Sequence, residues 1–302
     1  MKNKILLLIV VVLSVIAISG SKKETTYFNN AKKEEVKEEI KLALKDTLTG
    51  EIKNIELEDY IVGVVAGEMP ASFNEEALKA QAIASRTYAM YKMKNSNGTY
   101  DLVTDKTNQV YITEDKMKKL WQENFDYYFE KIKKAVYDTK DLIMTCNGNV
   151  ILSMYFARSN GKTEDAILVF GSNEEYLKSV ESPEESLTSE VTISKDEFCN
   201  KLNISCDAIN ISNVLKSSSG RINSLNINGK TFKGTEIRTL FDLKSTDFDI
   251  SIGSEIKFVT KGYGHGVGMS QYGANKLAQN GKNYEEILKN YYKNINIEKI
   301  IV

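Results

Sequence analysis

The sequence predicts an α+β fold, in which a mixed sheet with packed helices forms a substrate cleft. Helix and strand patterns are mixed along the chain, without the regular strand–helix–strand repeat of a doubly wound sheet. The 302 residues are enough for one large domain or two small ones with a sizeable core. An apolar run and a polar stretch precede the first predicted strand. We therefore expect one folded region over residues 40–302, preceded by an N-terminal membrane anchor.

Residues 1–20 carry the features of that anchor. A basic start, "MKNK", is followed by "ILLLIVVVLSVIAISG", sixteen residues without a charge. Such a run fits a signal peptide or a short membrane span. No clear small-x-small cleavage site follows, which favours an uncleaved single-pass anchor. Lys2 and Lys4 predict that the rest of the chain lies outside the cytoplasm. Residues 21–39 are polar and of mixed charge, as in a solvated spacer.

The first folded elements are expected to be two strands followed by two helices. "IKLALKD" and "EIKNIEL" have strand patterns and are joined by the turn "TLTG". The segment "LEDYIVGVVAGEMP" predicts an apolar helix that ends at Pro70. A second helix, "EEALKAQAIASRTYAMYKMK", follows with Asn74 as its N-cap. Its many alanines allow neighbouring elements to pack closely.

The remaining elements are short and mixed in type. After the loop "TDKTNQVY", we expect a helical stretch to about residue 140, then strands in "LIMTCNGNVILSMYFA" and a polar loop, "RSNGKTED". "SGRINSLNINGKTFKG" predicts a hairpin, and "NYEEILKNYYKNI" predicts a C-terminal helix. The segment 262–273, "GYGHGVGMSQYG", alternates glycine with larger residues. In a strand this pattern leaves one face bare, so we expect another group to approach that backbone closely.

Composition and charge exclude several classes of protein. The net charge is −1 and no basic stripe is interleaved with aromatic residues, so no nucleic-acid partner is expected. His265 is the only histidine, which rules out two-histidine metal motifs such as H-E-x-x-H. The segments G-x-S-x-G and G-x-G-x-x-G are absent from the sequence. Three cysteines allow at most one disulfide and fit no zinc template; Cys199 and Cys206 are close enough to form a small loop.

Glu68 is the most informative candidate residue. It continues one face of the predicted helix, formed by Leu57, Ile61, Val64 and Val65. Aliphatic surroundings raise the pKa of a carboxyl group, as a general acid requires. The alternative is a helix-end glutamate whose side chain reaches solvent, and the residues alone leave both readings open.

Five segments of the chain, in order, resemble one family. They are "LEDYIVGVVAGEMPASFNEEALKAQAIASRTYAM", "TNQVY", "YLKSVESP", "GRINSLNINGKTFKGTEIRTLFDLKSTDF" and "GYGHGVGMSQYGA". Together they resemble the stage II sporulation protein D family of peptidoglycan lytic transglycosylases, from about residue 40 to the C-terminus. The resemblance implies cleavage of the MurNAc–GlcNAc bond without water, leaving a 1,6-anhydro end. It also implies that Glu68, in the "GEMP" motif, is the catalytic residue, and that no cofactor takes part.

Motif positions in this family suggest further site residues. They indicate Arg86, Tyr176 and Lys178 as substrate-binding residues. Gln81 and Ser85, which lie four residues apart on a polar face of the second predicted helix, are expected to bind substrate as well. Those expected to support the cleft are His265, Tyr263 and Gln271, with either the sugar chain or the catalytic helix against the bare glycine face. The family commonly has F-H-S-T-S-G-G-x-T-E where this chain reads "YFARSNGKTED". Phe156 replaces the histidine, and Lys162 stands at a cysteine position of the zinc-binding members, so we expect no metal.

The resemblance also implies a biological setting. Family members act in the mother-cell membrane on the septal wall during engulfment, on glycan strands freed of peptides. The expected partners are stage II sporulation proteins P and M. Two other functions stay open. One is a non-catalytic wall-binding protein that stimulates a partner amidase. The other is a hydrolase that pairs Glu68 with a second carboxylate, for which Asp165 and Glu164 are the first candidates.

Overall fold

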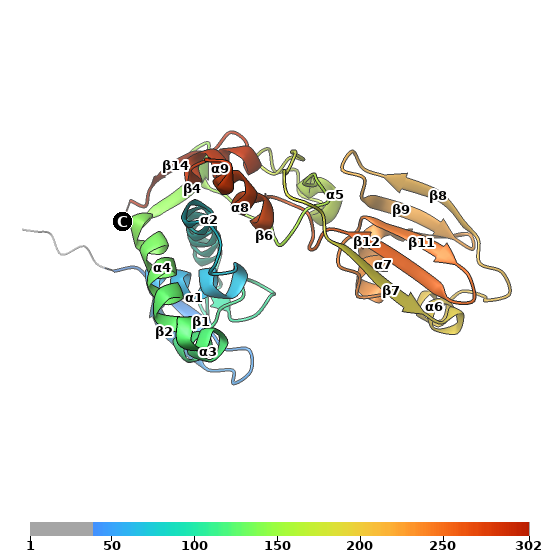
Figure 1. The fold of residues 1–302 in the computed structure, drawn as a ribbon, viewed down its shortest axis with the longest axis horizontal. Helices are drawn as coiled ribbons and strands as arrows, with labels where there is room; N and C mark the ends of the chain where they lie inside the picture. Colours follow the sequence, from blue (N-terminus) through green and yellow to red (C-terminus); the bar gives the residue numbers. More distant parts are fainter. Residues whose placement is uncertain (1–38, 302) are drawn as a thin grey trace, which may run out of the picture. The chain divides into compact units, whose positions relative to one another are not determined.

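The structure is a computed structural model that describes residues 39–301. The expected anchor and nearly all of the expected spacer lie outside these residues. Within residues 39–301, no helix has the length and apolar character needed to cross a membrane. Helices and strands alternate irregularly, which confirms the α+β class (Figure 1). The strands do not join in one mixed sheet. Among residues 39–301 they form five small sheets of two or three strands, and each strand is two to six residues long.

The first sheet precedes the helix that carries Glu68. Strands β1 (Lys41–Lys45) and β2 (Ile52–Glu56) pair antiparallel, and β3 (Leu102–Val103) joins the other edge of β1 in parallel. This confirms the two strands and the turn expected from the sequence. Helix α1 (Leu57–Glu68) follows β2 without a loop. It is buried along almost its entire length, which explains why its sequence is apolar on nearly all sides.

Helix α2 (Glu75–Lys94) is the centre of the larger core. Asn74 caps it by accepting a hydrogen bond from the backbone N–H of Glu76, as expected. The helix contacts α1, α4 (Phe125–Asp138), α8 (Gln271–Gln279), α9 (Tyr284–Tyr291) and strand β4 (Leu142–Cys146). Alanines along α2 are fully buried, so five elements approach its backbone closely. Figure 1 shows α2 enclosed by these elements.

Short elements complete this core. Helix α3 (Glu114–Trp121) and the 3-10 turn η1 (Gln122–Asn124) lead into α4. This confirms the helical stretch predicted to about residue 140. Strand β4 lies between β14 (Asn296–Lys299) and β5 (Asn149–Val150). Strand β6 (Tyr155–Phe156) pairs in parallel with β13 (Met269–Ser270), which brings the glycine-rich segment beside residues 154–158.

Residues 188–261 build a second, smaller core. Its elements are β7 (Thr188–Ile193), α6 (Lys195–Leu202), β8 (Ile211–Lys216), β9 (Ile222–Ile227), β10 (Lys230–Lys233), α7 (Gly234–Leu240), β11 (Phe248–Ile252) and β12 (Ile256–Lys261). Four phenylalanine rings fill the space between the sheets and the helices. Strands β9 and β10 form the predicted hairpin, whose turn residues Asn228 and Gly229 both have positive φ. Cys199, within α6, forms a disulfide with Cys206.

The glycine-rich segment differs from the expected extended strand. Gly262, Gly264, Gly266 and Gly268 all have positive φ, so the backbone coils, and only Met269–Ser270 is strand. A side chain at Gly268 would overlap the carbonyl oxygen of Met154, and one at Gly264 would overlap Phe156. One at Gly266 would meet the guanidinium of Arg221, 2.7 Å away. The groups closest to these glycines come from residues 154–160 and from Arg221, so the expectation that the catalytic helix lies against this segment is wrong. The expectation that the sugar chain lies there stays a prediction.

Candidate active site

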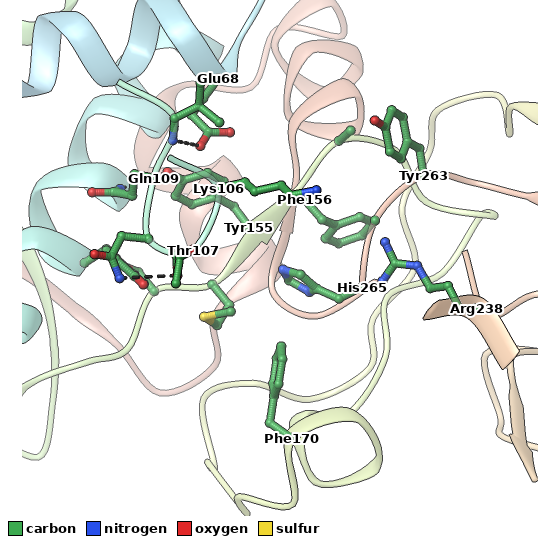
Figure 2. Close-up of a pocket in the computed structure, with 17 residues that line it drawn as sticks. Glu68, Lys106, Thr107, Gln109, Tyr155, Phe156, Phe170, Arg238, Tyr263 and His265 are labelled. Atoms are coloured by element: carbon green, nitrogen blue, oxygen red, sulfur yellow. Dashed lines mark hydrogen bonds between the residues drawn. The ribbon is translucent and has the colours of Figure 1, made fainter. Parts of the chain in front are cut away.

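A cavity of about 460 Å³ lies where the two cores meet. Its lining comes from the end of α1, Tyr88 of α2, the loop before α3, the segment around β6, helices α5 (Ala166–Phe170) and α7, and the glycine-rich segment (Figure 2). The charged residues among its lining are Glu68, Lys106 and Arg238. Its aromatic residues are Tyr88, Tyr155, Phe156, Phe170, Tyr263 and His265. The volume is within the range of ligand-binding pockets.

Glu68 is the last residue of α1, and Pro70 prevents the helix from continuing past it. Its side chain is half-buried at one end of the cavity (Figure 2). Oxygen Oε1 accepts a hydrogen bond of 2.7 Å from the backbone N–H of Val110, and Oε2 accepts one of 3.4 Å from Nε2 of Gln271. Burial raises the pKa of Glu68, although both hydrogen bonds oppose the shift. The carboxyl group is therefore held in place and retains its proton at higher pH than a solvated glutamate.

Two glycines in α1 allow Val110 to reach Glu68. A methyl group on Gly67 would overlap the carbonyl oxygen of Val110, and one on Gly63 would overlap the ring of Tyr111. The segment 110–112 therefore lies directly on the helix backbone, and the N–H of Ile112 donates to the carbonyl oxygen of Gly63. Sequence reasoning missed this contact. The spacing of the two glycines, four residues apart on one helix face, was the available signal.

Gln109 and Tyr155 form a second group that sequence reasoning missed. The amide Nε2 of Gln109 donates to the hydroxyl of Tyr155 at 2.8 Å, and its Oε1 accepts from the hydroxyl of Tyr60 at 3.1 Å. Burial, with Glu68 nearby, raises the pKa of Tyr155 well above its ordinary value. The hydroxyl group is therefore neutral, and the network fixes the wall beside Glu68. Both residues lie in quoted segments, but their separation in sequence concealed their contact.

His265 lines the same cavity and makes a structural contact there. Its Nδ1 accepts a hydrogen bond of 3.1 Å from the backbone N–H of Val267. Its ring packs against Phe156 and Phe170, with centroids 5.7 Å and 5.3 Å away. Burial, with the positive charge of Arg238, lowers the pKa of His265 to about 4. The imidazole is thus neutral at physiological pH, in keeping with the supporting role expected for it. Phe156, at the position of the family's usual histidine, forms part of this packing.

The other two expected support residues lie nearby. Tyr263 lines the cavity, is 45% exposed, and has the ammonium group of Lys244 over its ring. Gln271, at the start of α8, contacts Glu68 directly.

Three expected substrate-binding residues on α2 lie within the core, and none of them lines the cavity. The guanidinium of Arg86 is fully buried in a bidentate ion pair with Glu58, at 2.6 and 2.8 Å. Its Nη1 and Nη2 also donate to the carbonyl oxygens of Leu142 and Val136, respectively. Gln81 donates to the hydroxyl of Ser85 inside the same helix. Arg86 thus links α1, α2, α4 and β4. Because its side chain is fully buried, it cannot contact a substrate directly in this structure.

Tyr176 and Lys178 are also outside the cavity lining. The hydroxyl of Tyr176 accepts from the backbone N–H of Leu152 at 3.2 Å. The ammonium group of Lys178 donates to the side chain of Asn173 at 2.7 Å. The structure does not bring these two residues to Glu68.

The two candidate second carboxylates are engaged elsewhere. Glu164 is buried and accepts hydrogen bonds from the hydroxyl groups of Ser217 and Ser219. Asp165 accepts one from the backbone N–H of Ser179 at 2.7 Å. Neither lines the cavity, so within the described residues Glu68 is its only carboxylate.

Metal ligands are not grouped in the part of the chain that the structure describes. No three histidine, cysteine, aspartate or glutamate side chains among residues 39–301 are placed to hold an ion. Lys162, which the family resemblance places at a cysteine position of zinc-binding members, pairs with Glu181 at 3.3 Å.

The structure is an α+β protein, and the lining of its cavity has one carboxyl group, that of Glu68 at the end of a helix, an arrangement suited to acid–base chemistry. The family model described as Stage II sporulation protein matches residues 45–146. Stage II sporulation protein D of Bacillus subtilis (strain 168) is 39% identical over 265 residues, covering 84% of this chain and 77% of that protein. The Bacillus amyloliquefaciens protein of the same name is 38% identical over 260 residues, covering 82% and 76%. The chain belongs to the stage II sporulation protein D family of sporulation proteins.

A more distant relative has a different name. The Amidase enhancer of Bacillus subtilis (strain 168) is 30% identical over 294 residues, covering 76% of this chain and 39% of that protein.

Proposed function

We propose that this protein is a peptidoglycan lytic transglycosylase in which Glu68 is both the acid and the base. The observation that carries the proposal is the single carboxyl group in the cavity, with its raised pKa and two fixed hydrogen bonds. Hydrolytic glycosidases use two carboxyl groups about 5–10 Å apart. A reaction in which the sugar supplies its own nucleophile needs only one.

In the first step, protonated Glu68 donates its proton to the glycosidic oxygen between MurNAc and GlcNAc. The bond from C1 of MurNAc to that oxygen breaks, and GlcNAc leaves with a free 4-hydroxyl group. Burial favours the protonated form of Glu68 before this step.

In the second step, the carboxylate of Glu68 removes the proton from the 6-hydroxyl group of the same MurNAc. The oxygen then bonds to C1, which gives the 1,6-anhydro ring and returns Glu68 to its protonated form. Intramolecular attack replaces water and a second carboxylate, because the nucleophile is already held beside C1. The hydrogen bonds from Val110 and Gln271 stabilise the carboxylate formed between the two steps.

The test compares the full-length chain with its Glu68→Gln variant on peptide-free glycan strands. Mass spectrometry should find products lighter than hydrolytic products by one water, and the variant should lose activity by about 10²- to 10⁴-fold. Gln279→Met, an exposed change at the other end of α8, is the control for handling and folding. Products with reducing ends would instead indicate a hydrolase.

A second candidate function is stimulation of a wall amidase without cleavage of the glycan. The relative named Amidase enhancer favours it. In that case both the wild type and the Glu68→Gln variant would bind glycan strands, neither would cleave them, and both would raise the activity of the amidase equally.

The proposal extends to the setting of the reaction. Residues 1–20 would anchor the protein in the mother-cell membrane, with residues 40–302 facing the septal wall. Stage II sporulation proteins P and M would be its partners. The disulfide between Cys199 and Cys206 supports an oxidising compartment outside the cytoplasm. Fractionation of sporulating cells and co-purification with the two partners test these assignments.

A further inference from the structure

One end of the cavity carries positive charge without a protein partner. Arg238, on α7, is half-buried, and its Nε donates to the carbonyl oxygen of Leu243 at 3.3 Å. Its two terminal nitrogens make no hydrogen bond or ion pair with any residue in the range 39–301. Lys106 also lines the cavity and is in no ion pair within that range. Figure 2 shows the guanidinium directed toward His265, at the opposite end of the cavity from Glu68.

An unpaired guanidinium in this position is energetically unfavourable unless a ligand compensates for it. Burial lowers the pKa of Arg238, which reflects the cost of holding its charge away from water. Tyr263 and Asp242 act on Arg238 electrostatically and oppose this lowering of its pKa, but neither makes a hydrogen bond or ion pair with its terminal nitrogens. By contrast, the terminal nitrogens of Arg86 pair with Glu58, and buried Arg221 donates from a terminal nitrogen to the carbonyl oxygen of Lys162 and the hydroxyl of Ser219. The planar fork of an arginine matches a carboxylate, with two parallel hydrogen bonds.

We propose that Arg238 forms a subsite for a carboxylate carried by the saccharide substrate, with Lys106 adding positive charge. This proposal rests on the proposed function of the cavity. Glu68 would hold the glycosidic oxygen at one end, and Arg238 would hold the anionic substituent at the other. The lactyl group of a muramic acid is attached to the sugar ring itself, so its carboxylate stays within one ring of the bond to be broken. When a peptide is attached, that carboxylate becomes a neutral amide and the subsite loses its ligand.

Binding can be measured without cleavage in a Glu68→Gln background of the full-length chain. Three probes distinguish the source of the charge. They are peptide-free strands, the same strands with their lactyl carboxylates amidated, and strands that carry stem peptides. We expect peptide-free strands to bind about 10- to 100-fold more tightly than amidated strands. Adding Arg238→Gln should remove this difference and leave the affinity for amidated strands unchanged. Unchanged affinity for the neutral probe also shows that the variant is folded.

Two further variants sharpen the comparison. Arg238→Lys keeps the charge but loses the planar fork, so part of the preference should remain. Lys244→Gln removes an exposed positive charge outside the cavity lining and should leave the preference intact. If peptide-bearing strands bind tightly and depend on Arg238, the subsite takes a peptide carboxylate instead.

The proposal is overturned if charged and amidated strands bind equally well, or if Arg238→Gln weakens both to the same extent. These results are independent of the reaction. A chain that prefers charged strands through Arg238 but yields no anhydro products would retain the subsite and refute the transglycosylase.

Discussion

At Glu68, burial and hydrogen bonding shift the pKa in opposite directions. Burial disfavours the carboxylate, whereas the N–H groups of Val110 and Gln271 favour it. In the proposed reaction the group must give up a proton and take one back. A carboxyl group that was buried without donors would release its proton too reluctantly. The local contacts of Glu68 should therefore determine the pH dependence of the proposed activity.

Gln271→Met tests this balance, because methionine has a similar volume and no N–H group. Without the hydrogen bond, the charged form of Glu68 is less stable and its pKa rises. Glu68 then stays protonated to higher pH, so the alkaline limb of the kcat/KM profile should move to higher pH. Gln279→Met, on the same helix but exposed, should leave the limb in place. A shift to lower pH would contradict the role assigned to Gln271.

His265 should titrate far from the ordinary value of histidine. Its pKa is lowered to about 4, so the unfolded chain binds the proton more readily between pH 4 and about 6.5. The stability that the neutral ring contributes is complete above about 6.5 and is lost as the pH falls through 4. Because the chain has one histidine, an untagged sample gives one imidazole signal in an NMR titration. A midpoint near 6.5 in the folded protein would refute the structural role described here.

At the scale of elements, one face of α1 positions the site because two glycines leave it without side chains. Gly63 and Gly67 allow the segment 110–112 to lie on the helix backbone, and this contact places the Val110 N–H at Glu68. Helix ends fray more readily than helix centres. Here a second chain segment fixes the end that carries Glu68.

Gly67→Ala should therefore be harmful, although alanine favours a helix over glycine by about 1 kcal/mol. Its methyl group would overlap the Val110 carbonyl oxygen, which we expect to destabilise the protein by about 1–3 kcal/mol. Displacement of Val110 should also raise the pKa of Glu68 and move the alkaline limb of activity upward. Gly253→Ala is the matched control, since the nearest atom to its new methyl group is 3.7 Å away. Equal stability of both variants in thermal unfolding would disprove the packing argument.

The elements themselves could be predicted where a residue pattern has only one structural meaning. The apolar stripe and Pro70 define α1, Asn74 defines the start of α2, and the Asn228–Gly229 pair defines a hairpin. The glycine-rich segment could not be resolved in this way. Alternating glycines fit a bare strand and a coil with positive φ equally well, and only the neighbouring backbone decides between them.

The site was only partly predictable for a related reason. Glu68 was singled out because a carboxylate on an apolar stripe is unusual within one helix, but its proposed role came from the family resemblance. Arg86 was expected to bind substrate, but it forms a buried ion pair with Glu58 of another helix. A pattern within one helix does not predict such a pair. Arg238 belongs to the second core, and only the tertiary fold brings it to the cavity that contains Glu68.

At the scale of the whole molecule, the cavity joins two cores of different construction. The larger core, around α2, supplies Glu68 and its hydrogen-bond donors. The smaller core supplies Arg238, and the glycine-rich segment between β12 and α8 supplies His265 and Tyr263. Family membership places this chain among sporulation proteins, and the cavity is the part of it that the proposed chemistry depends on.

The most direct test of that chemistry is to run the reaction in water labelled with heavy oxygen. The full-length chain would cleave peptide-free glycan strands, and the new ends would be analysed by mass spectrometry. The proposed mechanism predicts anhydro ends that contain no heavy oxygen, because the 6-hydroxyl group of the sugar is the nucleophile. Reducing ends that contain heavy oxygen would show that water attacks C1, and would contradict a single-carboxylate transglycosylase.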